Sequence, residues 1–251
     1  MNPPSRPFVF AMALLAGICP AVAAETNVAV AANFTEPAKQ VAKAFKEKTG
    51  HDVLLSFGST GQFFTQITQD APFTVFLAAD DETPRRAVEG GWAVRDSVFA
   101  YAYGRLALWS HTPGVVAGEA ALKAGAFEKI AIANPKVAPY GAAAVEVMKG
   151  LGVWEALAPK VVQGANIAQT MQFVQTGNAE IGFVALSQVM TKPEGTRWIV
   201  PAALHAPIRQ DAVLLAKGAA DPVARAFVDF LKGPEAQAII GRFGYGVGVE
   251  G

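Results

Sequence analysis

Apolar residues follow two different periods along this chain, and the two periods alternate. Short runs rich in β-branched and small apolar residues predict strands at residues 27–32, 51–57 and 74–79. Each run is followed by a stretch with apolar residues every three to four positions, which predicts helices at residues 37–48, 62–69 and from about Glu82 onward. Three consecutive strand-helix units predict a parallel α/β lobe.

The same alternation continues in the second half of the chain and predicts a second α/β lobe. Further strands are expected at residues 105–110, 130–133, 181–184 and 212–216. The intervening helices are expected at residues 142–150 and 168–175. Two amphipathic helices, 222–231 and 234–243, are expected to close the chain.

The first 24 residues have the pattern of a signal peptide. Arg6 supplies positive charge, an apolar stretch follows at residues 8–18, and Ala21 and Ala23 form an Ala-x-Ala pair. The stretch of about eleven residues is too short to cross a membrane, which takes about twenty. We therefore expect an exported protein, with cleavage after Ala23 or Ala24.

Composition narrows the class of the mature chain. The single cysteine, Cys19, lies within the predicted signal peptide and follows Ile18, where a lipoprotein precursor has a small residue, so a lipid anchor is not expected. Without that segment no cysteine remains for a disulfide, a thiol nucleophile or a thiolate metal site. With 21 basic and 21 acidic residues and no dense basic run, the chain has no sign of a nucleic-acid surface.

Uncharged hydrogen-bond donors stand where two predicted strands end and helices begin. These are residues 33–35 (NFT) and 59–61 (STG). Helix N-termini with free N–H groups bind anions, although the same residue types are also ordinary helix caps. A third candidate is Tyr140, at the start of the helix after a Pro-containing turn, where the alternative is a packed aromatic. The glycine spacing around Ser59 fits neither a phosphate-binding P-loop nor a dinucleotide fingerprint.

A hydrolase or transferase on an α/β scaffold is the main alternative from another class. Such an enzyme needs a nucleophile, a base and an orienting group in one cleft. His51, His111 and His205 are expected at exposed positions, and neither GxSxG nor HExxH occurs. The acidic run 80–82 is interpreted as a helix start, because carboxylates complement the helix dipole there, rather than as a metal site.

Four segments together resemble the periplasmic molybdate-binding proteins. They are VAVAANFTEPAKQVAKAFKEKTGHDV, SFGSTGQFFTQI, AIANPKVAPYG and FVDFLKGPEAQAIIGRFGYGV, and the resemblance extends along nearly the whole mature chain. It implies a type II periplasmic-binding-protein fold, with two α/β lobes joined by two crossover strands. The implied division is a first lobe at 25–102, a second lobe at 103–208, and a return strand with C-terminal helices at 209–251. Hinge candidates are residues 99–106 and 205–213.

The resemblance also implies a set of anion ligands. This chain has Ala185 where one subgroup of the family supplies a tyrosine, and Tyr140 is expected to take over that donor role. No catalytic residue, cofactor or direct metal ligand is implied, since molybdenum would bind only as molybdate. In chain order, the implied ligands are Asn33 with the N–H of Ala32 or Asn33, Thr60 with Ser59 beside it, Tyr140, and the N–H of Ile167.

The same resemblance implies the ligand. Molybdate or tungstate is a fully deprotonated dianion, so a site made only of neutral donors can hold it, whereas hydrogen phosphate needs an acceptor for its proton. The expected partner is the membrane permease of an ABC transporter, and a monomer is expected. A binding protein of the same fold for another anion, such as sulfate, remains the alternative, because sulfate has the same charge and shape.

Overall fold

The computed structural model describes residues 23–112, 115 and 117–246. The predicted signal peptide, residues 1–24, lies outside the described residues except for Ala23 and Ala24, and Cys19 lies outside them too. Within the described residues, no helix has both the length and the apolar character needed to cross a membrane.

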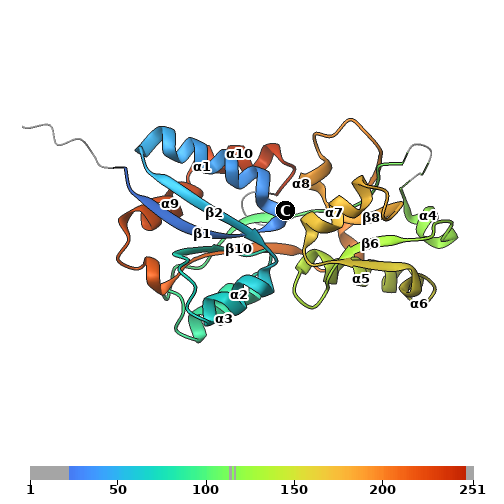
Figure 1. Cartoon of the computed structure of the whole chain (residues 1–251), viewed down its shortest axis with the longest axis horizontal. Coiled ribbons are helices and arrows are strands. Elements are labelled where there is room, and N and C mark those ends of the chain that lie inside the picture. Colours follow the sequence, from blue (N-terminus) through green and yellow to red (C-terminus); the bar gives the residue numbers. More distant parts are fainter. Residues whose placement is uncertain (1–22, 113–114, 116, 247–251) are drawn as a thin grey trace, which may run out of the picture.

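Two five-stranded sheets form two lobes that lie side by side along the long axis of the molecule (Figure 1). The first sheet has the order β2-β1-β3-β10-β4. Its first three strands are parallel, and β10 is antiparallel to both of its neighbours. The strands are β1 (Glu25–Ala31), β2 (Asp52–Gly58), β3 (Val75–Leu77), β4 (Phe99–Gly104) and β10 (Ile208–Leu214).

The second sheet repeats this arrangement with the order β7-β6-β8-β5-β9. Again three parallel strands are followed by one, β5, that is antiparallel to both neighbours. Only Arg105 separates β4 of the first sheet from β5 of the second, and β10 brings the chain back. The strands are β5 (Leu106–Ser110), β6 (Ile130–Ala133), β7 (Val161–Gly164), β8 (Ile181–Ala185) and β9 (Thr196–Ile199).

Helices cover both faces of each sheet (Figure 1). The first lobe carries α1 (Thr35–Thr49), α2 (Thr60–Thr68), α3 (Glu82–Glu89), α9 (Pro222–Lys232) and α10 (Pro234–Arg242). The second lobe carries α4 (Glu119–Ala124), α5 (Pro139–Gly150), α6 (Trp154–Leu157), α7 (Ile167–Gln175) and α8 (Leu186–Val189). Four short 3-10 turns complete the chain: η1 (Ala32–Phe34), η2 (Ala158–Lys160), η3 (Ala202–Leu204) and η4 (Ala216–Gly218).

Burial of β1 on both faces explains why its second half, residues 28–31, is continuously apolar. Val28 and Val30 pack with Phe45 and the helices α1, α9 and α10 in one core. Ala29 points to the opposite face and packs with Phe63 of α2 in a separate core. Successive strand residues face opposite sides of a sheet, so a parallel strand covered by helices on both sides needs apolar residues at every position.

The expectation of two α/β lobes is confirmed, and most predicted elements lie within a few residues of their observed positions. Two deviations are larger. The last strand begins at Ile208 and ends at Leu214, whereas residues 212–216 were expected. The elements β7, β9, α4, α6 and α8 were not expected, and β4 was expected only as a hinge segment. The predicted lobe boundaries near residues 102 and 208 fall in or beside β4 and β10, the strands that lead out of and back into the first sheet. The boundaries and hinges stay predictions.

Candidate functional site

Parallel strand register brings four helix starts to one place between the lobes. In the first sheet Ala31, the last residue of β1, is level with Gly58, the last residue of β2. In the second sheet Ala133 of β6 is level with Gly164 of β7. Because each strand runs directly into a turn or a helix, η1 and α2 begin at this end of the first sheet, and α5 and α7 begin at this end of the second sheet. Residues from all four helix starts line one cavity.

A small cavity lies among these four helix starts. The volume open to the centre of a water-sized sphere is about 10 Å³. Adding the radius of that sphere gives a hollow of roughly 2.7 Å radius. A hollow of this size excludes an amino acid or a sugar. None of the lining side chains is charged: Ala31, Ala32, Asn33, Gly58, Ser59, Thr60, Ala79, Ala138, Pro139, Tyr140, Asn166 and Ile167.

Ser59 supplies a buried hydroxyl that has no partner. Its residue is 3% exposed, and its Oγ is the one buried side-chain atom among the described residues without a hydrogen bond. Ser59 precedes α2, but its side chain does not cap the helix; instead its backbone N–H donates to Oε1 of Gln62 at 3.4 Å. Buried hydroxyls without partners are costly. This hydroxyl is therefore free to donate to a group inside the cavity.

Thr60, the neighbour of Ser59, has a different arrangement. Its Oγ1 accepts the backbone N–H of Ala79 at 3.0 Å, and the residue is 2% exposed. The hydroxyl thus has a structural bond that fixes the end of β3 against the start of α2. Its hydrogen has no acceptor in the described part of the chain, and Thr60 remains a donor candidate beside Ser59.

Backbone N–H groups at the helix starts supply further donors. An α-helix leaves its first N–H groups without intrahelical partners. In α7 the side chain of Asn166 accepts the N–H groups of Ala168 and Gln169, both at 3.0 Å, and leaves that of Ile167 free. In α5 the first residue is Pro139, which has no N–H, so Tyr140 carries the first donor. The N–H groups of Asn33, Tyr140 and Ile167 have no acceptor among the described residues. The sequence had predicted the N–H donors of Asn33 and Ile167, whereas for Tyr140 it had predicted the phenol as the donor.

The tight turn before α5 requires the glycine that follows Tyr140. A Cβ built on Gly141 would lie 2.1 Å from the carbonyl oxygen of Ala133, at the end of β6. Only glycine therefore lets the start of α5 approach the strand so closely. This contact explains why a glycine follows Tyr140 in the segment APYG and why the Tyr140 N–H can lie at the cavity.

The Asn33 side chain lines the cavity but is engaged by the protein. Its Nδ2 donates to Oε1 of Gln210 at 2.9 Å and to the hydroxyl of Tyr245 at 3.0 Å. Its backbone oxygen accepts the hydroxyl of Tyr245 at 2.7 Å and that of Ser187 in the second lobe at 2.9 Å. Both amide hydrogens of Asn33 are therefore used, which leaves its backbone N–H as the free donor.

Tyr140 joins the same network from the second lobe. Its phenol oxygen accepts Nε2 of Gln210 at 3.0 Å, and the residue is 2% exposed. Burial raises the pKa of the Tyr140 and Tyr101 phenols well above their ordinary value and that of Tyr245 to about 12. These phenols therefore stay protonated at neutral pH.

Four members of this network were not expected from the sequence: Tyr101, Ser187, Gln210 and Tyr245. Nor does the sequence single out Gln210, because it stands between Arg209 and Asp211 in a polar run at the start of the return strand. Nothing in the sequence places Ser187 or Tyr245 next to Asn33, because 154 and 212 positions separate them along the chain.

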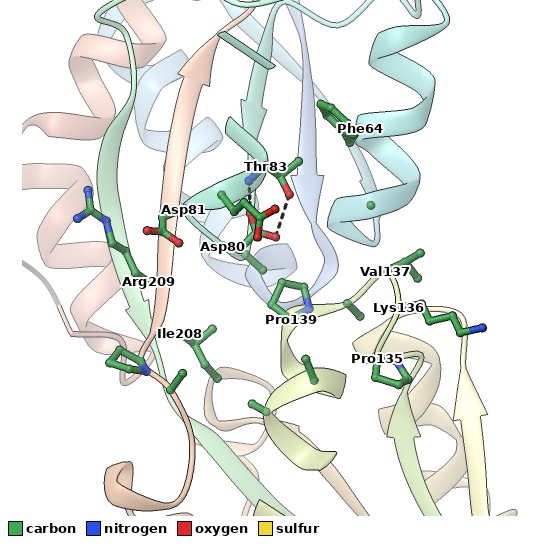
Figure 2. A pocket seen from close by; sticks show the side chains of 18 of the residues that line it. Phe64, Asp80, Asp81, Thr83, Pro135, Lys136, Val137, Pro139, Ile208 and Arg209 are labelled. Carbon is green, nitrogen blue, oxygen red and sulfur yellow. Dashed lines mark hydrogen bonds between the residues drawn. The ribbon is translucent and has the colours of Figure 1, made fainter. Parts of the chain in front are cut away.

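A larger cavity of about 520 Å³ opens beside the small one, and Figure 2 shows its lining. It is the poorer anion site, because Asp80, Asp81, Glu82 and Glu146 line it. Asp80 accepts the N–H and the hydroxyl of Thr83 at 2.8 and 3.0 Å, which fits the predicted helix-start role.

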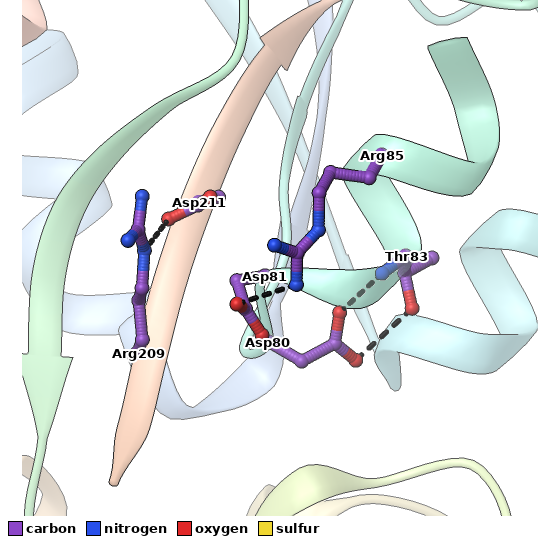
Figure 3. Close-up of polar contacts among 6 residues, drawn as sticks. All are labelled: Asp80, Asp81, Thr83, Arg85, Arg209 and Asp211. Carbon is purple, nitrogen blue, oxygen red and sulfur yellow. Dashed lines mark hydrogen bonds and ion pairs between the residues drawn. The ribbon is translucent and has the colours of Figure 1, made fainter. Parts of the chain in front are cut away.

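The charges in and around this larger cavity pair mostly with one another. Figure 3 shows Arg85 with Asp81 at 2.6 Å and Arg209 with Asp211 at 2.8 Å. Burial raises the pKa of Asp80 above its ordinary value. In the described part of the chain, no group of three or more acidic, histidine or cysteine residues is arranged to hold a metal ion.

The histidines do not assemble a catalytic centre in either cavity. His51, His111 and His205 are absent from the lining of both. His51 accepts the N–H of Ala24 at 3.3 Å, and His205 contacts the backbone oxygen of the next residue at 2.7 Å. Neither contact orients a base toward a nucleophile.

Comparison with known proteins agrees with this geometry. A family model described as bacterial extracellular solute-binding protein matches residues 26–246. The molybdate-binding protein ModA of Rhodobacter capsulatus is 56% identical over 236 residues, which are 94% of each chain. The structure of the periplasmic molybdate-binding protein of Azotobacter vinelandii has a TM-score of 0.86 at 37% identity, over 89% of this chain and 100% of that one.

The fold is also found with other ligands. The sulfate-binding protein SubI of Mycobacterium tuberculosis has a TM-score of 0.72 at 12% identity, over 88% of this chain and 86% of that one, a likeness that shows the fold alone. The matches confirm the predicted type II periplasmic-binding-protein fold. The chain belongs to the bacterial extracellular solute-binding proteins and, within them, to the family of the periplasmic molybdate-binding proteins.

Proposed function

We propose that this protein captures molybdate, and also tungstate, in the small cavity between its lobes. The observation that carries the proposal is the buried, partnerless hydroxyl of Ser59 among four helix starts, in a cavity without a charged side chain. Several neutral donors and helix N-termini together stabilise a dianion. A dianion that needs no acceptor is the ligand that this set of groups fits.

The ligand assignment of the hydroxyl loop follows from the contacts. We assign the main side-chain donor to Ser59, since its Oγ has no other partner, and a secondary role to Thr60, whose Oγ1 already accepts from Ala79. The sequence had favoured Thr60, with Ser59 as its neighbour. Asn33, Tyr140 and Ile167 contribute through backbone N–H groups, and Ala32 lines the cavity beside Asn33.

Discrimination against phosphate and sulfate has two different origins in this proposal. Hydrogen phosphate carries a proton that needs an acceptor, and the Oδ1 of Asn166 already accepts two N–H groups. Sulfate has the same charge as molybdate and no proton, so cavity size alone separates the two. The larger anion fits donors that are set slightly further apart, on all sides, by the helix starts of two lobes.

Export and delivery complete the proposed function. We propose that residues 1–24 direct export and are removed, that the mature protein acts in the periplasm as a monomer, and that it delivers its anion to the permease of an ABC transporter. Relative movement of the two lobes would admit and release the anion, as in hinged binding proteins generally. The protein then binds its ligand without transforming it.

Native mass spectrometry of the mature protein with an equimolar mixture of molybdate, tungstate, sulfate and phosphate tests this function. We expect one anion per chain, and that anion to be molybdate or tungstate. A complex with sulfate or phosphate under these conditions would contradict the assignment. Turnover of simple ester substrates by the same preparation would instead support the hydrolase alternative.

A further inference from the structure

Gln210, a buried residue on the return strand β10, joins the two lobes through its side chain. Its residue is 0% exposed. Its Oε1 accepts Nδ2 of Asn33 at 2.9 Å and the hydroxyl of Tyr101 at 3.0 Å, both in the first lobe. Its Nε2 donates to the phenol oxygen of Tyr140 in the second lobe at 3.0 Å. One amide therefore contacts two residues of the anion cavity, one from each lobe.

The backbone around Gln210 is built to place this amide. The pairing of β10 with β4 shifts register between Gln210 and Asp211, and the extra residue is Tyr101 of β4, whose hydroxyl bonds to Gln210. On the neighbouring strand, a Cβ built on Gly104 would lie 2.2 Å from the Tyr140 hydroxyl and 2.5 Å from Nε2 of Gln210. A glycine at this position thus leaves the space that the Gln210–Tyr140 pair fills.

The contacts also fix which way the amide points. With its two ends exchanged, Nε2 of Gln210 would face Nδ2 of Asn33, and two donors would oppose each other without an acceptor. In the observed orientation Gln210 donates to Tyr140, so the phenol oxygen accepts and its own hydrogen is left for another acceptor. Gln210 thereby sets the hydrogen-bond direction of residues from both lobes.

We propose that Gln210 is a positioning residue for oxyanion capture, whose bond to Tyr140 holds the lobes together around the anion and slows its release. The inference rests on the proposed function, because it concerns the same cavity. Gln210 lies in the sheet of the first lobe and Tyr140 starts a helix of the second. The bond between them must therefore break when the lobes separate, while entry of the anion into the open protein does not depend on it.

Substitution Gln210→Met tests this role, because methionine has a similar volume and no amide. Gln237→Met is the matched control, since within the described residues the Gln237 amide bonds only to the backbone of Tyr101 and Leu231, both in the first lobe. Release of radiolabelled molybdate into an excess of tungstate gives the dissociation rate, and calorimetry gives the Kd. We expect roughly 10-fold faster release for Gln210→Met, equivalent to about 1.4 kcal/mol, with the association rate within about twofold. The control should match the wild type.

A double-mutant cycle with Tyr140→Phe separates positioning from general destabilisation. Both single variants remove the same bond, so the double variant should release molybdate no faster than the faster single variant. Multiplying effects, or release from Gln210→Met at the wild-type rate, would overturn the inference. If Gln210→Met does not fold, Tyr140→Phe alone decides, because it removes the bond from the other lobe. Wild-type protein that binds no oxyanion at all would instead refute the proposed function.

Discussion

The substitution Ser59→Ala should weaken ligand binding without lowering the stability of the anion-free protein. For the anion, the variant removes a hydroxyl donor from a dianion in a cavity without charged side chains. A hydrogen bond to a charged group contributes about 1.5–3 kcal/mol, so molybdate affinity should fall by roughly 10- to 150-fold. Calorimetry on the wild type and the variant measures this loss directly.

For the anion-free protein, the same substitution should cost little. Replacing a serine at a helix start by alanine normally destabilises a protein by about 1 kcal/mol, because a capping bond is lost. Here the Ser59 side chain makes no capping bond, and its Oγ is buried without a partner. We therefore expect a free energy of unfolding equal to or slightly above that of the wild type.

Two results would refute this reasoning. Unchanged molybdate affinity in Ser59→Ala would show that the hydroxyl does not face the ligand. A loss of more than about 1 kcal/mol in the unfolding free energy of the anion-free variant would show that Ser59 has a structural partner after all. Chemical denaturation without anion, followed by calorimetry with molybdate, provides both readouts from one preparation.

Three further substitutions or conditions test other parts of the site. Thr60→Val should lower the unfolding free energy by about 1–3 kcal/mol in urea titrations, because the buried N–H of Ala79 loses its acceptor; an unchanged midpoint would contradict this. Gly61→Ala should weaken molybdate binding in calorimetry, since its Cβ would lie 3.1 Å from Cα and Cβ of Val137 across the cleft and hinder closure; wild-type affinity would argue against closure there. Molybdate affinity should stay flat between about pH 6 and 9, because burial raises the pKa of Tyr245 to about 12 and no lining side chain is charged. Stability from that neutral phenol is complete below its ordinary pKa of 10.0 and is lost as pH rises toward about 12, where alkaline unfolding monitored by circular dichroism should appear.

The alternation of strands and helices could be predicted from the sequence because its physical cause is local. Parallel strands covered on both faces give continuous apolar runs such as the one around Val28, and each is followed by an amphipathic helix. The short strands β7 and β9 could not be predicted. Each has only four residues, and most of their side chains are partly buried or exposed, so no apolar run marks them. The start of the return strand was missed because Arg209, Gln210 and Asp211 interrupt its apolar pattern.

The sequence was enough to predict which segments form the candidate site, but not which atoms face the anion. Resemblance to a family indicated the loops around Asn33, Ser59, Tyr140 and Ile167, and the structure brings all four together. Sequence could not show that Thr60 rather than Ser59 bonds to Ala79, because that contact depends on how β3 packs against α2. It also could not show the bridging amide of Gln210, since its partners lie 177 and 70 positions away along the chain.

The relative affinity for molybdate and sulfate is the most direct test of molybdate capture, because these dianions share charge and shape and differ in size. Calorimetry on the mature wild-type protein with each anion separately gives both Kd values under identical salt and pH. We expect one molybdate per chain and sulfate binding at least roughly 100-fold weaker, a difference of about 2.7 kcal/mol. Sulfate binding equal to or tighter than molybdate binding would contradict the proposed function.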